Sequence, residues 1–243
     1  MKTSILNVQF DNLTLEQAAS RFVGFLGEDA PRAVFTPNPE MVMLAQKDDE
    51  FKGILNSADL LVPDGIGIVK ASRLTPSKIK ERVPGIELVA SIFEREEAKD
   101  ATWYFLGGRP DVAEMAKTKL QANHPHLKVV GCHHGYFAED EEEVIARNIA
   151  ETNADIVLVG LGFPRQERFI NKYKSTIGAK VLVGVGGSFD VFSENLKRAP
   201  KIFRKMGMEW LYRLLRQPSR IWRQRVLVKF AFKVIISKLR GTL

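Results

Sequence analysis

The chain has 243 residues, of which 45% are hydrophobic and 27% charged, and its formal net charge is +7. This ordinary globular composition excludes a mainly disordered, collagen-like or disulfide-rich chain, and the single cysteine, Cys132, excludes an intrachain disulfide. The length suits one large domain or two small ones. Residence in the cytosol fits these observations.

Short apolar runs alternate with helical patterns along the body of the chain. Strands are expected at 32–36, 58–62, 101–106, 127–132, 155–160 and 180–185. Helices are expected at 15–26, 85–98, 111–121, 140–151 and 164–175. This alternation predicts an α/β fold with a mostly parallel sheet and helices on both faces.

The expected strand ends carry glycine or proline beside polar or aromatic residues. These segments are 36–40, 63–67, 107–108, 135–137, 162–167 and 186–190. Ligands of such folds bind beyond the carboxyl ends of the strands. The six ends therefore predict one shared crevice.

Asp64 follows a buried strand and a proline, and a glycine comes next. This setting would hold its carboxylate rigidly at the crevice, as a general base requires. An Asx-turn or a helix cap fits the same spacing equally well. Thr36 and Asn38 flank a proline in a stiff loop and can hydrogen-bond a sugar or a phosphate, or cap the helix expected over 40–46.

Gln166 falls in the first turn of an expected helix and faces the crevice, and Glu167 beside it complements the helix dipole. Arg82 precedes another helix, where its guanidinium suits a diphosphate. The alternative for Arg82 is a surface ion pair with Glu87.

Glycine pairs end two of the strands, at Gly107-Gly108 and Gly186-Gly187. They let backbone N–H groups approach an anion, or they are plain tight turns. Neither is part of a Walker sequence or of an early G-x-G-x-x-G fingerprint. The chain has no Asp-x-Asp pair, and its four histidines with Cys132 lack a second cluster at ligand spacing. We therefore expect no metal, and arginines must then take the charge of a departing diphosphate.

Residues 196–243 hold 14 of the 36 Lys and Arg but a single acid, for a net charge of +13, whereas residues 1–195 carry −6. We place a boundary near residue 196. The basic tail predicts a partner with phosphates: nucleic acid, an anionic lipid or a diphosphate substrate. Basic residues recur there at helical spacing, interrupted by Pro218, at Arg213, Arg216, Arg220 and Arg223, and then at Lys229, Lys233 and Arg240.

A basic stripe on a largely apolar helix favours the membrane interface over nucleic acid, since aliphatic and aromatic residues dominate between the bases. The alternative is a core helix or one that packs on a second copy as a homo-oligomer. The N-terminus lacks the apolar core of a secretory signal, and no stretch reaches the roughly 20 apolar residues of a membrane span. We expect a peripheral protein at the cytoplasmic face of the cell membrane.

Eight motifs occur in an order typical of one family. They are Thr36-Pro37-Asn38-Pro39-Glu40, Pro63-Asp64-Gly65-Ile66-Gly67, Arg82-Val83-Pro84-Gly85, Phe105-Leu106-Gly107-Gly108, the segments 160–167 and 184–190, Arg198-Ala199-Pro200, and the segment 207–213. Together they resemble the WecG/TagA/CpsF glycosyltransferases, from about residue 36 to residue 223.

The resemblance implies a Rossmann-like catalytic domain over 1–195 and a C-terminal appendage over 196–243 that meets the membrane and helps complete the active site. It implies an inverting, metal-independent transferase without a cofactor. The chain looks most similar to the TagA type, which moves N-acetylmannosamine from UDP to N-acetylglucosamine on undecaprenyl diphosphate. The product is the linkage disaccharide of wall teichoic acid.

The family's functional residues map onto matching positions. Asp64 matches the general base. Polar pocket residues match Thr36, Asn38, Arg82 and Gln166. The nucleotide side matches Gly186, Gly187 and Asp190. From its position at a strand end, and not from a family match, Tyr136 is expected to stack on uracil. Appendage arginines that face diphosphate match Arg213, Arg220 and Arg223.

Three alternatives stay open from the sequence. The same fold can use another UDP-sugar, such as the uronic acid of N-acetylmannosamine or a hexose. The second alternative is a nucleotide-binding oxidoreductase, but this chain lacks the early glycine fingerprint that such an enzyme would have. The third is a non-enzymatic adaptor that binds a membrane or nucleic acid through the tail. It would not explain why polar residues are crowded at the strand ends.

Overall fold

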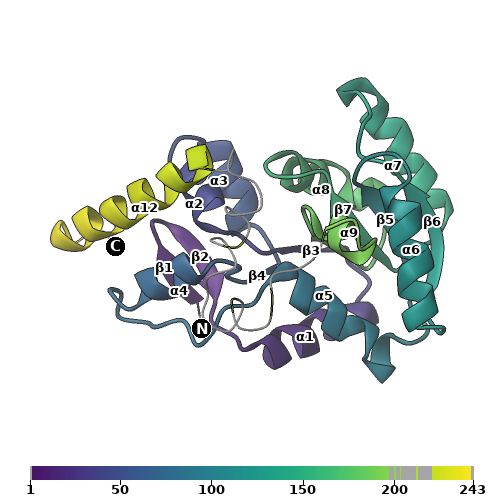
Figure 1. The fold of residues 1–243 in the computed structure, drawn as a ribbon, viewed down its shortest axis with the longest axis horizontal. Coiled ribbons are helices and arrows are strands. Elements are labelled where there is room, and N and C mark those ends of the chain that lie inside the picture. Colours follow the sequence, from purple (N-terminus) through teal and green to yellow (C-terminus); the bar gives the residue numbers. More distant parts are fainter. Residues whose placement is uncertain (1, 197–199, 201–202, 204–211, 213–220, 242–243) are drawn as a thin grey trace.

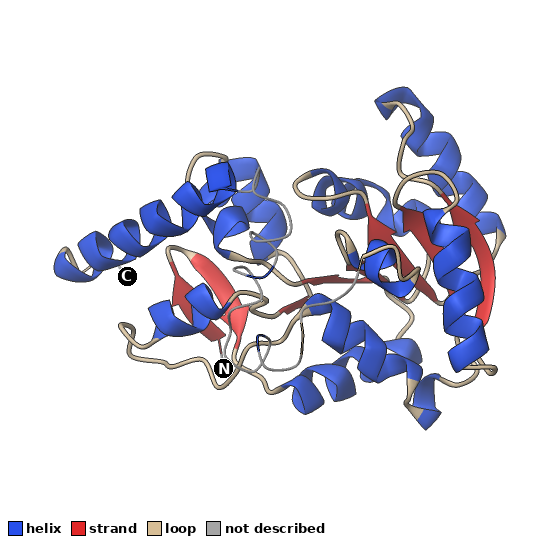
Figure 2. Cartoon of the chain, in the orientation of Figure 1, coloured by secondary structure: helices blue, strands red, loops and turns tan. Residues whose placement is uncertain are grey.

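The computed structural model describes residues 2–196, 200, 203, 212 and 221–241, and the side chains of all of these except 221–224. Six parallel strands form one sheet in the order β4-β3-β8-β7-β5-β6 (Figures 1 and 2). Their bounds are β3 Arg32–Phe35, β4 Leu60–Leu61, β5 Thr102–Gly107, β6 Lys128–His133, β7 Ile156–Gly160 and β8 Val181–Gly184. All six predicted strands are confirmed. An antiparallel hairpin of β1 (Lys2–Ile5) and β2 (Val8–Asp11) was not predicted.

Helices fill the connections between the strands. They are α1 Leu15–Gly24, α2 Pro39–Ala45, α3 Asp49–Asn56, α4 Ile66–Ser72, α5 Gly85–Phe93, α6 Val112–Asn123, α7 Glu142–Glu151, α8 Arg165–Ile177, α9 Ser188–Phe192 and α12 Ile221–Leu239, with short 3-10 turns η1 Phe25–Gly27, η2 Glu96–Ala98 and η3 Glu139–Glu141. The five predicted helices are present. Three of them are divided: the helix expected over 15–26 ends at Gly24 and is followed by η1, the helix expected over 85–98 ends at Phe93 and is followed by η2, and η3 precedes α7.

Alternate residues of β3, β4, β5, β7 and β8 point into two separate cores. Val34 belongs to the core that includes residues of α1, α5, α6 and α9 on one face, while its neighbour Phe35 belongs to the core that includes residues of the hairpin, α2, α3, α7 and α8 on the other. Ile156 and Val157 of β7 divide in the same way. Strands buried on both faces read as continuous apolar runs, which is why the sequence revealed them.

The connections at the centre of the sheet leave toward opposite faces. The chain passes from β3 and from β7 to helices of one core, α2 and α8, but from β8 to α9 of the other core. Because β8 lies between β3 and β7, these diverging connections open a crevice at the carboxyl ends of the strands, where ligands bind in open α/β sheets.

Helix α12 packs beside α2 and α4 at one end of the molecule (Figure 1). Phe230 and Val234 are 3% and 2% exposed and join the core that contains Phe35. The predicted helical stretch at the end of the tail is therefore confirmed for this segment. Among the residues that the structure describes, no helix is long and apolar enough to cross a membrane.

Candidate functional site

A cavity of about 760 Å³ lies at the carboxyl ends of β4, β3, β8 and β7, four strands that are consecutive in the sheet. The loops that follow these strands form its polar wall. Seven residues singled out in the sequence line it: Thr36, Asn38, Asp64, Arg82, Gln166, Gly186 and Gly187. Segments far apart along the chain thus meet at one site.

Asn38 holds the loop after β3 in place. Its Oδ1 accepts hydrogen bonds from the backbone N–H groups of Glu40 at 2.9 Å and Met41 at 3.1 Å, so that it caps α2. The capping role considered for this residue is thus present, and Asn38 also lines the cavity. Since its oxygen is used by the cap, its amide nitrogen is the group that can donate to a ligand.

Asp64 follows β4 in a loop that interlocks with the loop of Asn38. The Asp64 backbone N–H donates to the Pro37 carbonyl oxygen at 3.1 Å. A Cβ on the next residue, Gly65, would lie 2.5 Å from Pro39 Cδ, so only glycine allows this close packing. The Asp64 carboxylate is thereby carried at the cavity on a backbone tied to a second loop.

Arg82 approaches from the segment before α5. The adjacent Val83 N–H donates to the Pro63 carbonyl oxygen at 2.8 Å, which ties this segment to the loop of Asp64. The Arg82 guanidinium lies 4.0 Å from the Glu87 carboxylate, and its side chain is 16% exposed. Arg82 therefore forms the ion pair considered from the sequence and also lines the cavity.

Gln166 and Glu167 lie in the first turn of α8 and are 6% and 1% exposed. Gln166 Nε2 donates to Glu167 Oε1 at 2.7 Å, and Gln166 Oε1 accepts from the Gly186 N–H at 2.9 Å. Burial raises the pKa of Glu167 to about 7. The sequence assigned Glu167 only to the helix dipole and missed this buried contact. One sequence signal for a buried first turn was available: Gln166, the neighbour of Glu167, lies at helical spacing from the buried Phe169 and Ile170.

The opposite wall of the cavity is apolar and comes from α12. Leu227, Phe230 and Val234 line it from this helix. Facing them on α4 are Ala71 and, just beyond the helix, Leu74. The cavity is therefore amphipathic, with hydrogen-bonding and charged groups at the strand ends and hydrocarbon beside α12.

Two predicted residues lie outside the described lining of this cavity. Tyr136 is 68% exposed, in a loop that Arg165 holds through hydrogen bonds to the Gly135 and Phe137 carbonyl oxygens at 3.2 and 2.9 Å. Asp190 is in α9, with its carboxylate 3.9 Å from the Arg109 guanidinium.

The appendage arginines are only partly covered. Arg213 and Arg220 lie outside the described residues, and Arg223 belongs to α12 with a side chain that is not described. Among the described residues, no group of three or more His, Cys, Asp and Glu is arranged to hold a metal ion. Burial raises the pKa of Cys132 to about 12, so its thiol stays protonated near neutral pH.

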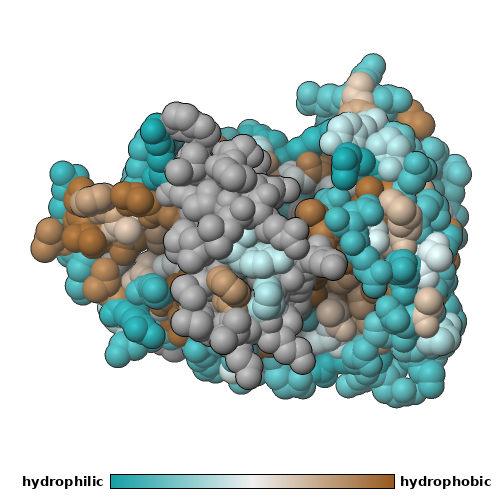
Figure 3. Space-filling model, viewed as in Figure 1, coloured by the Kyte–Doolittle hydropathy of each residue, from teal (hydrophilic) through white to brown (hydrophobic). Residues whose placement is uncertain are grey.

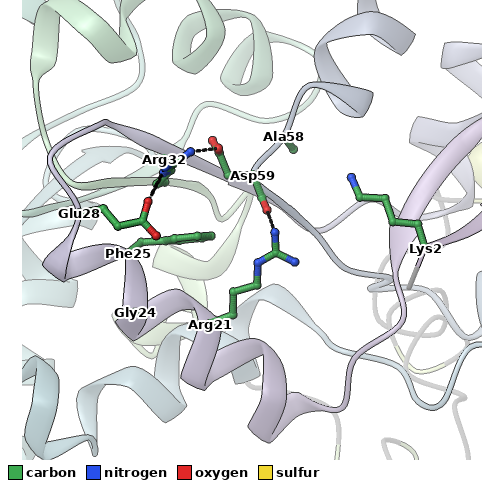
Figure 4. A pocket seen from close by; sticks show the side chains of 8 residues that line it. All are labelled: Lys2, Arg21, Gly24, Phe25, Glu28, Arg32, Ala58 and Asp59. Atoms are coloured by element: carbon green, nitrogen blue, oxygen red, sulfur yellow. Dashed lines mark hydrogen bonds and ion pairs between the residues drawn. The ribbon is translucent and has the colours of Figure 1, made fainter.

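A second cavity, of about 460 Å³, lies at the opposite, amino-terminal edge of the sheet (Figure 4). The guanidinium groups of Arg21 and Arg32, which line this cavity, hydrogen-bond to neighbouring protein oxygens. Arg21 donates to Asp11 Oδ1 at 3.1 Å and to the Asp59 carbonyl oxygen at 2.8 Å, and Arg32 pairs with Glu28 and Asp59. These contacts join β2, α1, β3 and the start of β4, so we assign this cavity to the fold and not to a ligand.

The chain is similar to known proteins along nearly its whole length. The model of the glycosyl transferase WecG/TagA/CpsF family matches residues 3–242. A relative from Staphylococcus aureus (strain MRSA252), named N-acetylglucosaminyldiphosphoundecaprenol N-acetyl-beta-D-mannosaminyltransferase, is 36% identical over 239 residues, covering 98% of this chain and 93% of the relative. The relative of the same name from strain MW2 is 35% identical over the same shares of the two chains.

Proposed function

Because this chain belongs to the WecG/TagA/CpsF family of glycosyl transferases, we propose that it transfers N-acetylmannosamine from UDP-N-acetylmannosamine to N-acetylglucosamine on undecaprenyl diphosphate. The transferred sugar and the acceptor are those in the name of the S. aureus relatives. The product would be the linkage disaccharide of wall teichoic acid.

The observation that carries this proposal is the amphipathic cavity. Its polar wall offers the carboxylate, amide, guanidinium and backbone groups that suit a sugar and a diphosphate, among them Asp64 and Arg82. Its apolar wall, which includes Leu227 and Phe230, suits the first part of a polyprenyl chain. A small water-soluble acceptor would leave the second wall without a ligand to contact.

In the proposed reaction Asp64 removes the proton of the acceptor hydroxyl while that oxygen bonds to the anomeric carbon of the donor. The bond from this carbon to the β-phosphate oxygen breaks on the opposite side, and its electron pair leaves with UDP. The attack inverts the anomeric configuration. Assistance by a general base contributes about 10²–10⁴-fold to the rate, and Thr36, Asn38 and Gln166 would position the two sugars.

The departing UDP carries negative charge that the protein must stabilise. Arg82 lies in the cavity, and we assign the same task to Arg213, Arg220 and Arg223 of the appendage. Gly186 and Gly187 would lie on the nucleotide side, where the Gly187 N–H can bind a phosphate oxygen while the Gly186 N–H stays with Gln166, and Asp190 and Tyr136 would lie beyond the cavity edge on the uridine side. The chain has no Asp-x-Asp pair, so this charge stabilisation would be independent of a divalent metal.

The proposal divides the chain into a catalytic domain over 1–195 and an appendage over 196–243 that binds the membrane. Support comes from the outer face of α12, where Val228 and Phe232 are 57% and 64% exposed and Leu239 is 82% exposed. Apolar surface gathers over this helix in Figure 3. Exposed Lys229 and Arg240 lie beside this face, an arrangement that suits an anionic lipid surface. The membrane in question would be the cytoplasmic leaflet, where the protein is held peripherally.

Sugar transfer by the purified full-length protein tests the proposal. The reaction contains UDP-N-acetylmannosamine and a short-chain lipid diphosphate carrying N-acetylglucosamine, with and without EDTA, and UDP-N-acetylglucosamine serves as the control donor. We expect equal amounts of disaccharide-lipid with and without EDTA, and none from the control donor. A reaction that stops in EDTA would contradict metal independence. Absence of product despite UDP binding would contradict the donor and acceptor.

A further inference from the structure

Glu167 is a buried carboxyl group that the proposed reaction does not use. It is 1% exposed, and its Oε2 atom has no hydrogen-bond partner among the described residues. A buried polar oxygen without a partner costs free energy, and such an atom in a native structure calls for an explanation. We look for the reason in the contact that the other oxygen of this carboxyl group, Oε1, makes with Gln166.

Glu167 Oε1 accepts a hydrogen bond from Gln166 Nε2 at 2.7 Å, and Gln166 Oε1 accepts one from the Gly186 N–H at 2.9 Å. A glutamine amide has one accepting end and one donating end. If the amide were reversed, its NH₂ group would face the Gly186 N–H, and its oxygen would face the Glu167 carboxyl oxygen. The contact with Glu167 therefore determines which end of Gln166 meets Gly186.

The glycine loop after β8 closes tightly around this amide. A Cβ on Gly184 would lie 2.8 Å from Gln166 Nε2, and Gly186 has a φ of +52°. Gly186 and Gly187 line the cavity together with Gln166. The orientation of one side chain thus fixes a stretch of backbone that forms part of the cavity wall.

We infer that Glu167 is a positioning residue: it orients the Gln166 amide so that its oxygen holds the Gly186 backbone and its second N–H points to an acceptor oxygen of the sugar nucleotide in the cavity. This inference rests on the proposed function for the ligand, but its structural part does not. Nε2 carries two hydrogens, one of which goes to Glu167. The second has no bond to another described residue and is available to the ligand.

Hydrogen exchange of the ligand-free protein tests the structural part. In protein labelled with ¹⁵N-glycine, Glu167→Met removes the acceptor oxygen at similar side-chain length, whereas Glu167→Gln keeps an acceptor oxygen. We expect the Gly186 amide to exchange about tenfold faster in E167M and within about twofold of the wild-type rate in E167Q. Gly178, whose N–H donates to Lys174 at the far end of α8, is the control amide.

Two exchange results would overturn the inference. One is an unchanged Gly186 rate in E167M. The other is an equal acceleration at Gly186 and Gly178, which would mean that Glu167 only stabilises the helix. If E167M does not fold, Glu167→Asp withdraws the carboxyl group by one methylene, and the same acceleration at Gly186 is expected from it.

Steady-state kinetics test the part that concerns the ligand. We expect E167M to raise the donor KM about tenfold, with kcat within about threefold of the wild type, and E167Q to restore most of the affinity. The double variant Q166L/E167M should have the same donor KM as Q166L alone, because Glu167 acts through Gln166. Independent, multiplying effects would overturn the positioning role. If the wild type transfers no sugar, the proposed function fails, and the exchange experiment still decides the role of Glu167.

Discussion

Asp59 and Asp64 lie at opposite ends of the same strand, β4, and they differ in what they contact. Asp59 Oδ1 pairs with Arg32 at 2.8 Å, and its Oδ2 accepts the Ala33 N–H at 2.8 Å, so that both oxygens bind the neighbouring strand. Asp64 lines the large cavity, and its backbone N–H bonds to Pro37 of the adjacent loop.

The difference shows that polar side chains have different roles at the two ends of a parallel strand. At one end they hold neighbouring elements together, and at the other they line the ligand cavity. At the amino-terminal edge, charged groups such as Arg21 and Asp59 are used to join strands and helices (Figure 4). At the carboxyl edge, backbone contacts such as that between Val83 and Pro63 join the loops, and uncharged side chains such as Gln166 add to them. Side chains there remain in position to meet a ligand, which is the general advantage of this edge.

The largest effect is expected from Asp64→Asn. This change keeps the shape of the side chain but removes the base, so kcat at saturating substrates should fall by at least about 100-fold. The free energy of unfolding should stay within about 0.5 kcal/mol of the wild-type value. Turnover and urea denaturation measure the two quantities. A folded variant with nearly wild-type turnover would remove Asp64 from the role of base.

A smaller effect is expected from the helix beside the carboxyl edge. Phe232→Ala removes an exposed ring of α12 and should weaken binding to phosphatidylglycerol vesicles about tenfold, without a change in melting temperature. Phe230→Ala is the matched variant, because this ring is buried against the body. It should reduce the hydrogen-exchange protection of α12. Unchanged vesicle binding of F232A would contradict membrane contact through this face.

The amino-terminal edge should respond in the opposite way to the carboxyl edge. Asp59→Ala loses the Arg32 ion pair and the Ala33 hydrogen bond, so the free energy of unfolding should fall by about 1–2 kcal/mol. The kcat of the folded fraction should not change, because the site is at the other edge. If D59A lowered kcat as strongly as D64N, the two edges would not be separable.

The last prediction concerns the pH dependence of stability. The pKa of Glu167 is raised to about 7 from an ordinary value of 4.5, so the unfolded chain loses this proton first as pH rises. Glu167 therefore stabilises the fold most below pH 4.5, and this contribution is lost as pH rises toward 7, by up to about 1.4 kcal/mol per pH unit. Urea denaturation of E167Q, which cannot ionise, should show a flatter profile across this range. Parallel profiles would contradict a raised pKa.

The sequence predicted the six-stranded sheet because each strand is an apolar run between helical patterns, and it predicted the crevice because polar residues follow those runs. It did not predict the β1–β2 hairpin. The tight turn there consists of Leu6 and Asn7, with φ of 51° and 63°, in place of the Asn-Gly pair that marks such turns. The burial of Glu167 was also missed, because the helical spacing of its neighbour Gln166 does not reveal that the pair packs beside Gly184 of a distant strand.

A titration of ¹⁵N-glycine-labelled protein with UDP tests most directly which edge of the sheet holds the active site. Gly186 and Gly187 line the carboxyl-edge cavity, whereas Gly24 lines the amino-edge cavity beside Arg21. We predict saturable shifts of the Gly186 and Gly187 amide signals and no shift of the Gly24 signal. Saturable shifts at Gly24, with Gly186 and Gly187 unchanged, would contradict the assignment of the active site to the carboxyl edge.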